Sequence, residues 1–254
     1  MKKIALAAAA ASLLLTGAAS AADMAPRYTK APPPVVAPIY NWTGFYIGIN
    51  GGGGWADKCW DIFNDVGFPI APFREGCHTA SGGTVGGQIG YRWQAAQWVF
   101  GLEAQGNWAD FKGSNASLFF APGAAINRTK VDAFGLFTGQ VGYAWNNFLW
   151  YVKGGAAVTN DKYEGIIGGT GIVFDRAEET RWGAAVGTGI EYGFGPGWSL
   201  GIEYNHLFMG HRDINLTFVA APGVLSRGET IRQDVDIVTA RINYRFGGPI
   251  VAKY

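Results

Sequence analysis

The sequence predicts an all-β fold, an eight-stranded antiparallel transmembrane β-barrel with long outer loops and short periplasmic turns. The clearest evidence is residues 98–108, where large apolar residues alternate with glycine, glutamate, glutamine and asparagine. Successive side chains of a strand point to opposite faces, so this alternation produces one apolar and one polar face. Seven other segments repeat the pattern, and short and long connections alternate between them. An even number of strands with long loops on one side is typical of outer-membrane barrels.

The first four predicted strands are residues 42–55, 84–93, 98–108 and 131–145. Each has aromatic or branched residues at alternate positions, with glycine, amide or charged residues between them. A strand with lipid on one side and a wet interior on the other requires this contrast. The residues predicted to face lipid are Phe45, Ile47 and Ile49, then Val85, Ile89, Tyr91 and Trp93, then Trp98, Phe100 and Leu102, then Val131, Ala133, Phe137, Val141 and Tyr143.

The last four predicted strands are residues 148–159, 181–194, 198–208 and 235–246. They show the same period of two, and glycine is frequent on their polar face. The residues predicted to face lipid are Phe148, Trp150, Val152 and Val158, then Trp182, Ala184, Val186, Ile190 and Tyr192, then Trp198, Leu200, Ile202 and Tyr204, then Val238, Ala240, Ile242, Tyr244 and Phe246.

The connections fall into two classes. Short turns are predicted at residues 94–97, 146–147 and 195–197, where Asn-Asn and Gly-Pro-Gly sequences favour tight turns. We expect Trp98, Trp150, Trp182 and Trp198 beside these turns, as an interfacial aromatic girdle. The predicted long loops are residues 57–79, 112–129, 160–179 and 209–233.

The two ends of the chain differ from the barrel in composition. Residues 1–21 have a basic start, an apolar stretch and a small-residue cleavage site, which predict a secretory signal peptide. The apolar stretch is shorter than the roughly 20 residues that a spanning helix needs. Residues 22–41 are rich in proline and are predicted to be an extended periplasmic linker. Residues 42–246 form a single predicted barrel domain, and residues 247–254 are a predicted periplasmic tail.

The charge balance argues against one class of partner, and the two cysteines predict a disulfide. The chain has 20 basic and 19 acidic residues, so removal of Lys2 and Lys3 with the signal peptide leaves 18 against 19. This balance provides no basic surface for nucleic acid. Cys59 and Cys77 lie in one predicted loop of an exported protein, where a disulfide is expected. A metal site is the less favoured alternative, because His78 is the only other soft ligand nearby.

Charged residues within the predicted strands all fall on the face opposite the aromatic residues. A soluble ligand-binding barrel would place its apolar face inside, and this aromatic face is too bulky to fill an eight-stranded interior. Lipid is therefore predicted outside and a network of paired charges inside. Its members are Arg92, Glu103, Asp132, Lys153, Arg181, Glu191, Glu203, Arg241 and Arg245.

Several motifs resemble one known family. The segments 42–48, 151–157 and 187–192, together with the ending at 243–246, resemble the small porin-like outer-membrane proteins of alphaproteobacteria. The resemblance covers nearly the whole mature chain and implies an eight-stranded barrel of the OmpA membrane-domain type. It also implies that the barrel-assembly machinery reads a terminal aromatic residue. Tyr244 and Phe246 match this signal, and Tyr254 is the alternative because eight residues follow Phe246.

The function predicted from these features is structural. An eight-stranded interior is just wide enough for side chains to fill, so paired charges are expected to close it. Solute passage as a small porin is the alternative, in line with the family's description. Outer-membrane lipid and the assembly machinery are the expected partners, and no cofactor is expected.

Two further functions would depend on the outer rim and the outer loops. Hydrolysis would require a histidine at the outer rim, and His206 and His211 are placed there, but no serine is found at a matching height. No enzymatic activity is therefore expected. Haemin binding through His78, His211 or a loop tyrosine remains an alternative, as does adhesion to a host surface through the outer loops.

Overall fold

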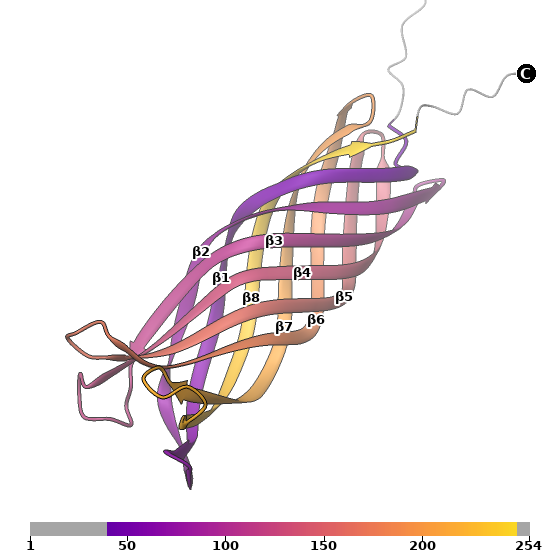
Figure 1. The fold of residues 1–254 in the computed structure, drawn as a ribbon. Helices are drawn as coiled ribbons and strands as arrows, with labels where there is room; N and C mark the ends of the chain where they lie inside the picture. The colour runs from indigo at the N-terminus through magenta and orange to yellow at the C-terminus, as the bar shows by residue number, and fades with distance from the viewer. Residues whose placement is uncertain (1–39, 248–254) are drawn as a thin grey trace, which may run out of the picture. The chain divides into compact units, whose positions relative to one another are not determined.

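The computed structural model describes residues 40–247, which form a closed antiparallel barrel in which β8 pairs with β1 (Figure 1). The fold predicted from the sequence is confirmed. The predicted signal peptide, almost all of the predicted linker and nearly all of the predicted tail lie outside the described residues. Within residues 40–247, no helix is long and apolar enough to cross a membrane. The strands are β1 (Gly44–Asp65), β2 (Phe68–Ala95), β3 (Trp98–Ala116), β4 (Ala125–Trp145), β5 (Phe148–Ile167), β6 (Val173–Gly195), β7 (Trp198–Phe218) and β8 (Leu225–Arg245).

Tight turns close the periplasmic end, at the positions that the sequence predicts. The β4–β5 turn consists of Asn146 and Asn147, and Asn146 has a left-handed backbone with φ of 54°. The β6–β7 turn contains Gly197 at φ of 81°. Two-residue hairpin turns need positive φ because this matches the twist of the flanking strands. Asparagine and glycine adopt that conformation at little cost.

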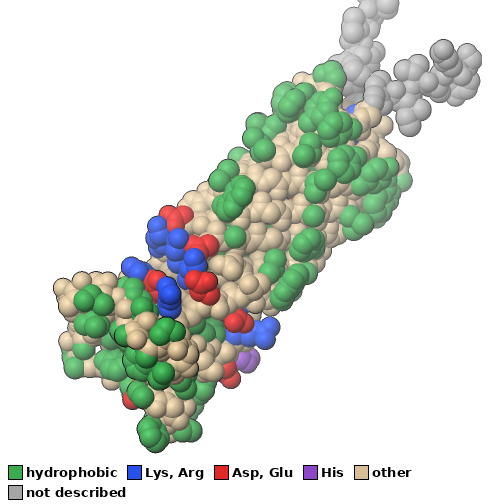
Figure 2. Space-filling model, in the orientation of Figure 1, with side chains coloured by type: hydrophobic (Ala, Val, Ile, Leu, Met, Phe, Trp, Pro, Cys, Tyr) green, Lys and Arg blue, Asp and Glu red, His purple; other side chains and the backbone are tan. Residues whose placement is uncertain are grey.

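The outer wall of the barrel is apolar over one band (Figure 2). Large side chains remain exposed there, for example Leu102 at 63% and Trp108 at 75%. Such a surface is stable in hydrocarbon and unfavourable in water. On the outer side this band ends near Trp55, Trp108 and Trp182, and we take the strand segments between these residues and the short turns as membrane-spanning. Trp182 was expected beside a short turn, but it is paired with Val158 in the middle of β5.

The predicted long loops are mostly strand. Each of the four segments predicted as outer loops continues the barrel wall as a β-hairpin. Beyond the band, the outward face meets water, so it no longer needs to be apolar, and the alternation that marks a strand becomes weak. Within the described chain, the connections between strands on this side are reduced to residues 66–67, 117–124, 168–172 and 219–224.

A β-bulge in β4 changes which face Asp132 occupies. The pairing of β3 with β4 shifts between Trp108 and Phe111, and that of β4 with β5 shifts between Val131 and Ala133. An extra residue in one strand reverses the inside–outside alternation beyond it. Val131 is therefore fully buried in the interior, and Asp132 lies on the outer wall. Both had been predicted on the opposite faces.

Candidate functional site

The interior of the barrel is the candidate site, and its periplasmic half contains a compact ion network. Arg92 on β2 reaches across to Glu191 on β6, with its Nη1 atom 2.9 Å from Oε2 and its Nη2 atom 2.6 Å from Oε1. Two parallel N–H···O bonds of this kind are the strongest arrangement for an arginine and a carboxylate. Both side chains are almost completely buried.

Two further cations share two further carboxylates in the same network. The Nζ atom of Lys153 lies 3.1 Å from Glu103 and 2.6 Å from Glu203. Arg241 donates hydrogen bonds to the same two glutamates. With Arg92 and Glu191, the network has three cations and three anions, so its formal charge is zero. Neutrality matters here because an unpaired buried ion costs several kcal/mol.

Two tyrosines join the network to the barrel wall. Tyr46 donates its hydroxyl to Glu103 at 2.7 Å, and Tyr151 donates to Glu203 at 2.6 Å. Glycines opposite these rings make room for them. A Cβ atom at Gly90 would lie 2.6 Å from the Tyr46 hydroxyl, and one at Gly189 would lie 2.5 Å from that of Tyr151. A glycine on the inner face is therefore the partner of a large side chain that crosses the interior.

The segment before β1 covers the periplasmic mouth. Tyr40 and Trp42 are buried, and their rings lie 4.5 Å apart. The backbone N–H of Trp42 donates to Gln94 at 3.0 Å, and that of Tyr40 donates to Asn147 at 3.3 Å, so the end of β2 and the β4–β5 turn hold the segment. The cavity left between these rings and Arg92 is only about 10 Å³, which is roughly the volume that one water centre occupies.

Outside this network lies an apolar layer. Along β1 the inward positions change from Tyr46 and Asn50, which belong to polar clusters, to Ala56, which belongs to this layer. Side chains from all eight strands fill the interior at this level without a polar atom among them. They are Ala56, Ala80, Phe111, Val131, Phe134, Leu136, Ala157, Ala185, Leu207, Met209, Val235 and Ile237.

Further polar layers follow toward the cell exterior. The Nζ atom of Lys58 is 2.7 Å from Asp161, and both side chains are fully buried. Nearer the outer end, Arg227 binds Glu75 at 3.0 Å and Asp175 at 2.8 Å. These residues were missed in the sequence, because they lie in segments predicted to be loops. Lys58, Asp161, Asp175 and Arg227 keep the inward phase of the neighbouring predicted strands, and this was the available signal. Glu75 does not keep it, because the pairing of β1 with β2 shifts between Trp60 and Asp61.

Glu229 is the exception in the outermost cluster. Its side chain is fully buried, and neither carboxylate oxygen has a hydrogen-bond partner among the described residues. Its nearest cation, Arg227, is 3.5 Å away and already serves two other carboxylates. Burial, followed by the negative charge of Glu75, raises the pKa of Glu229 to about 9. This carboxyl group is therefore protonated at neutral pH.

Arg181 was predicted to belong to the charge network, but it has another role. The ladder between β6 and β7 is interrupted between the pairs Ala184–Phe208 and Arg176–Thr217. Backbone carbonyls left without a strand partner must find another donor. The Nη2 atom of Arg181 lies 3.1 Å from the Gly210 carbonyl oxygen and 3.5 Å from that of Met209. Arg181 thus bridges a gap in the wall.

The other predicted members of the network divide into two groups. The structure brings together Arg92, Glu103, Lys153, Glu191, Glu203 and Arg241. It does not bring Asp132 or Arg245 into this group. Asp132 contacts Lys130 and Lys162 on the outer wall, at 2.7 and 2.8 Å. Arg245 lies at the periplasmic end, where its guanidinium donates to the Thr43 carbonyl at 3.0 Å.

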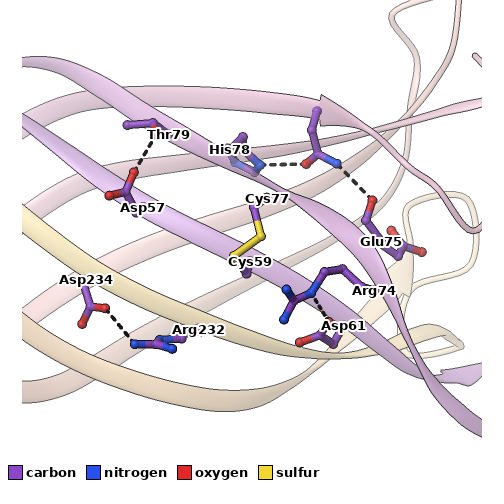
Figure 3. Close-up of a disulfide and its surroundings, with 11 residues drawn as sticks. Asp57, Cys59, Asp61, Arg74, Glu75, Cys77, His78, Thr79, Arg232 and Asp234 are labelled. Carbon is purple, nitrogen blue, oxygen red and sulfur yellow. Dashed lines mark hydrogen bonds and ion pairs between the residues drawn. A yellow bond between two sulfur atoms is a disulfide. The ribbon is translucent and has the colours of Figure 1, made fainter.

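Cys59 and Cys77 form a disulfide that links β1 directly to β2 (Figure 3). The residues predicted as a loop around them, 57–79, are a hairpin, so the disulfide lies on the outer wall beyond the membrane-spanning band. Among the described residues, no group of three or more His, Cys, Asp or Glu side chains could hold a metal ion.

Of the three candidate histidines for catalysis or haemin binding, two are hydrogen-bonded to other side chains and the third is exposed. His206 Nδ1 is 2.7 Å from Asp236, which also accepts the Tyr204 hydroxyl at 2.5 Å. Within residues 40–247, no Ser, Thr or Cys side chain is hydrogen-bonded to either member of this pair. Both ring nitrogens of His78 are engaged, by Asn115 at 2.7 Å and Thr129 at 3.2 Å. His211 lies exposed on β7.

An eight-stranded barrel with a lipid-facing band and a filled interior defines an integral outer-membrane protein. The chain belongs to the outer membrane protein beta-barrel domain family, whose sequence model matches residues 8–246.

Curated relatives come from the alphaproteobacteria. The 31 kDa outer-membrane immunogenic protein of Brucella melitensis is 31% identical over 84% of this chain and 90% of its own length. The 22 kDa outer membrane protein of Rhizobium leguminosarum is 28% identical over 76% of this chain and 74% of its own. The protein is accordingly an outer-membrane protein of the group that the sequence resembles.

A solved structure supports the fold alone. The outer membrane protein OprG of Pseudomonas aeruginosa superimposes with a TM-score of 0.57 at 16% identity, covering 82% of this chain and 98% of that structure.

Proposed function

We propose that this protein is a structural, non-enzymatic component of the outer membrane whose barrel is closed to ions and solutes. The observation that carries the proposal is the succession of three different seals along one interior. Tyr40 and Trp42 cover the periplasmic mouth, a neutral ion network lies next, and an apolar layer follows. An ion would have to displace aromatic rings, break buried ion pairs and then enter a layer without polar partners.

Planar-bilayer conductance in molar salt tests this proposal. The mature chain is refolded in detergent, and folding is verified by the change in gel mobility on heating. Folded protein is expected to insert without producing conductance steps. Frequent steps of reproducible size would overturn the proposal and favour the small-porin alternative.

A second function is favoured by the outer tips of the barrel. The four outer connections, residues 66–67, 117–124, 168–172 and 219–224, contain no charged residue, and each exposes at least one large apolar side chain. Apolar surface of this kind marks interaction sites in soluble surroundings. We propose that these tips are the surface through which the protein contacts other molecules outside the cell. The relatives named as immunogenic proteins suggest the same exposure.

Adhesion assays with cells that display the protein test this second function. Replacing Val66 and Leu118, which are exposed at 53% and 65%, with serine should reduce attachment while leaving the amount of folded barrel unchanged. The matched control is Leu102→Ser, at an equally exposed position on the lipid-facing band. Undiminished attachment of the tip variant would exclude these tips as the adhesive surface.

We propose further that the barrel-assembly machinery reads the end of β8. Tyr244 and Phe246 are outward-facing neighbours whose ring centroids are 5.0 Å apart. Phe246→Ser should lower the amount of folded protein in the outer membrane, yet leave refolding in detergent unaffected. Loss of assembly with Tyr254→Ser instead would assign the signal to the last residue of the chain.

A further inference from the structure

Three lysines form a row across the outer wall of the barrel. Lys112 on β3 is directly opposite Lys130 on β4, and Lys130 is directly opposite Lys162 on β5. All three side chains point outward, with 58%, 39% and 39% of their surface exposed. Like charges directly opposite each other on neighbouring strands are unfavourable. A row of three therefore needs an explanation.

Neighbouring carboxylates pair with the three lysines but do not use all of their N–H donors. Lys112 contacts Asp110 at 2.8 Å, and Asp132 lies between Lys130 and Lys162 at 2.7 and 2.8 Å. An ammonium group has three N–H donors. Among the described residues, each of these lysines has one carboxylate within 3 Å. Asp110 is also 4.0 Å from Lys130 and Glu178 is 3.9 Å from Lys162, both beyond hydrogen-bond distance, so each lysine retains donors for a further acceptor. The carboxylates offset the mutual repulsion of the lysines and gather the three ammonium groups into one cluster.

The position of the row indicates what this acceptor is. Asp110, which Lys112 contacts, is two residues beyond Trp108, and Trp108 ends the lipid-facing band on β3. Two residues of a strand span about 7 Å, or about 5 Å along the normal of a tilted barrel. The lysine head groups therefore lie in the polar layer next to the hydrocarbon. Figure 2 shows charged side chains gathered between the apolar wall and the outer hairpins.

We propose that Lys112, Lys130 and Lys162 bind the phosphate groups of an outer-leaflet lipid whose acyl chains lie along the apolar wall below them. The lysine row lies directly beyond the lipid-facing wall. One lipid molecule can therefore contact the wall with its acyl chains and the lysines with its phosphate groups. Phosphate oxygens accept hydrogen bonds from several lysines at once and compensate the positive row. This inference rests on the outer-membrane location and does not depend on whether the interior conducts.

The opposite side of the barrel has different charges and supplies an internal control. There Asp57 on β1 is directly opposite Asp234 on β8, so two negative charges face the same layer. Exposed cations are present but scattered. Arg232 is 3.6 Å from Asp234, and Arg74 is 3.1 Å from Asp61. A lipid phosphate would be repelled on this side, so binding should be confined to the wall formed by β3, β4 and β5.

Binding of bis-phosphorylated lipid A to the folded full-length barrel in detergent, measured by native mass spectrometry, tests the proposal. The triple variant Lys112→Gln, Lys130→Gln and Lys162→Gln should bind about 100-fold more weakly, because each basic residue at an anionic lipid surface contributes appreciably to affinity. The matched control removes the same charge elsewhere, through Arg74→Gln, Arg232→Gln and Arg212→Gln, the last at an exposed position on β7 opposite Ile231 of β8. It should retain wild-type affinity.

Three outcomes would overturn the proposal. Equal loss in both triple variants would mean that net charge alone attracts the lipid. Equal binding of a dephosphorylated lipid with the same acyl chains would exclude the phosphates as the recognised group. Binding of inorganic phosphate with the affinity of the lipid would assign the row to a free anion. If the triple variant does not fold, Lys130→Gln alone, at the centre of the row, should weaken binding of lipid A more than Arg232→Gln does, and an equal effect would again overturn the proposal.

Discussion

At the scale of single residues, a charge inside this barrel is stable only together with its partners. Glu103 accepts hydrogen bonds from Tyr46 at 2.7 Å, from Lys153 at 3.1 Å and from Arg241. Its replacement by glutamine keeps the volume but leaves the two cations with one carboxylate fewer. Breaking a buried ion pair by removing one partner typically costs 3–5 kcal/mol.

We therefore expect Glu103→Gln to lower the free energy of unfolding by about 3 kcal/mol, measured by urea unfolding of the barrel in lipid vesicles. Glu178→Gln is the control, because that side chain is 61% exposed and its change should stay within about 0.5 kcal/mol. Similar small effects for both variants would mean that the network contributes little to stability.

Replacement of Glu229 by glutamine should raise the free energy of unfolding, whereas replacement of Glu103 lowers it. Its pKa is raised to about 9 by burial and by the neighbouring Glu75, whereas the unfolded chain has an ordinary carboxyl pKa near 4.3. Between these two values the folded state holds a proton that the unfolded state has released, so stability falls as the pH rises. Glutamine mimics the protonated form and lacks this dependence.

Glu229→Gln should therefore stabilise the barrel at pH 8, and the gain should shrink toward zero as the pH falls to about 4.5. Thermal unfolding across this pH range, followed by gel mobility or circular dichroism, measures the difference. A stabilisation that is the same at pH 5 and pH 8 would show that Glu229 does not hold a proton in the folded protein.

At the scale of elements, the hairpin of β1 and β2 has unequal support. β1 pairs with β8 as far as Asp65–Arg227, whereas the pairing of β2 with β3 ends at Ser81–Lys112. The outer part of β2 therefore has a full ladder on one side only. The Cys59–Cys77 disulfide crosses this hairpin and encloses a separation of 18 residues. A loop of this size corresponds to about 3 kcal/mol in the chain-entropy description.

The variant with both Cys59→Ser and Cys77→Ser should keep the membrane-spanning barrel folded but open the outer part of the hairpin. Limited proteolysis of protein in vesicles should then cleave within residues 60–76, where the wild type is resistant. Reduced wild-type protein should behave like the variant. Proteolysis that spreads into the membrane-spanning segments would indicate that the disulfide supports the whole barrel.

At the scale of the whole molecule, the barrel is closed by layers of different chemistry rather than by one constriction. The mouth depends on aromatic rings, the ion network on paired charges, and the next layer on apolar packing. Interiors are packed about as densely as organic crystals, so each layer alone excludes a hydrated ion. Altering one of them leaves two intact.

We expect three variants to remain silent in planar bilayers: Trp42→Ala, Glu103→Gln with Arg241→Gln, and Phe111→Ala with Phe134→Ala. The combination of all five substitutions should also stay silent when gel mobility shows it folded, because the fully buried Lys58–Asp161 pair and the Arg227 cluster still fill the interior beyond the apolar layer. Conductance steps from any one of the three variants would mean that a single layer closes the barrel and that the other two do not.

Much of the fold was predictable from the sequence, because lipid imposes a simple rule. Hydrocarbon outside and a filled interior inside require side chains to alternate strictly, so eight segments with a period of two were enough to predict the barrel, its turns and its location. The same rule places Glu103 and Lys153 on the inner face. In the outer extensions the outward face meets water, the rule no longer holds, and Lys58 and Arg227 were missed.

What the sequence determined by itself is therefore the number of strands, the lipid-facing side and the residues that share the interior. Only the tertiary structure decided which of those residues meet. Arg92 contacts Glu191 from 99 positions away, and strand tilt and register, which leave no local pattern, set that pairing. The bulge beside Asp132 and the gap beside Arg181 are of the same kind. Each depends on how one strand fits its neighbour, and alternation within a single strand does not record it.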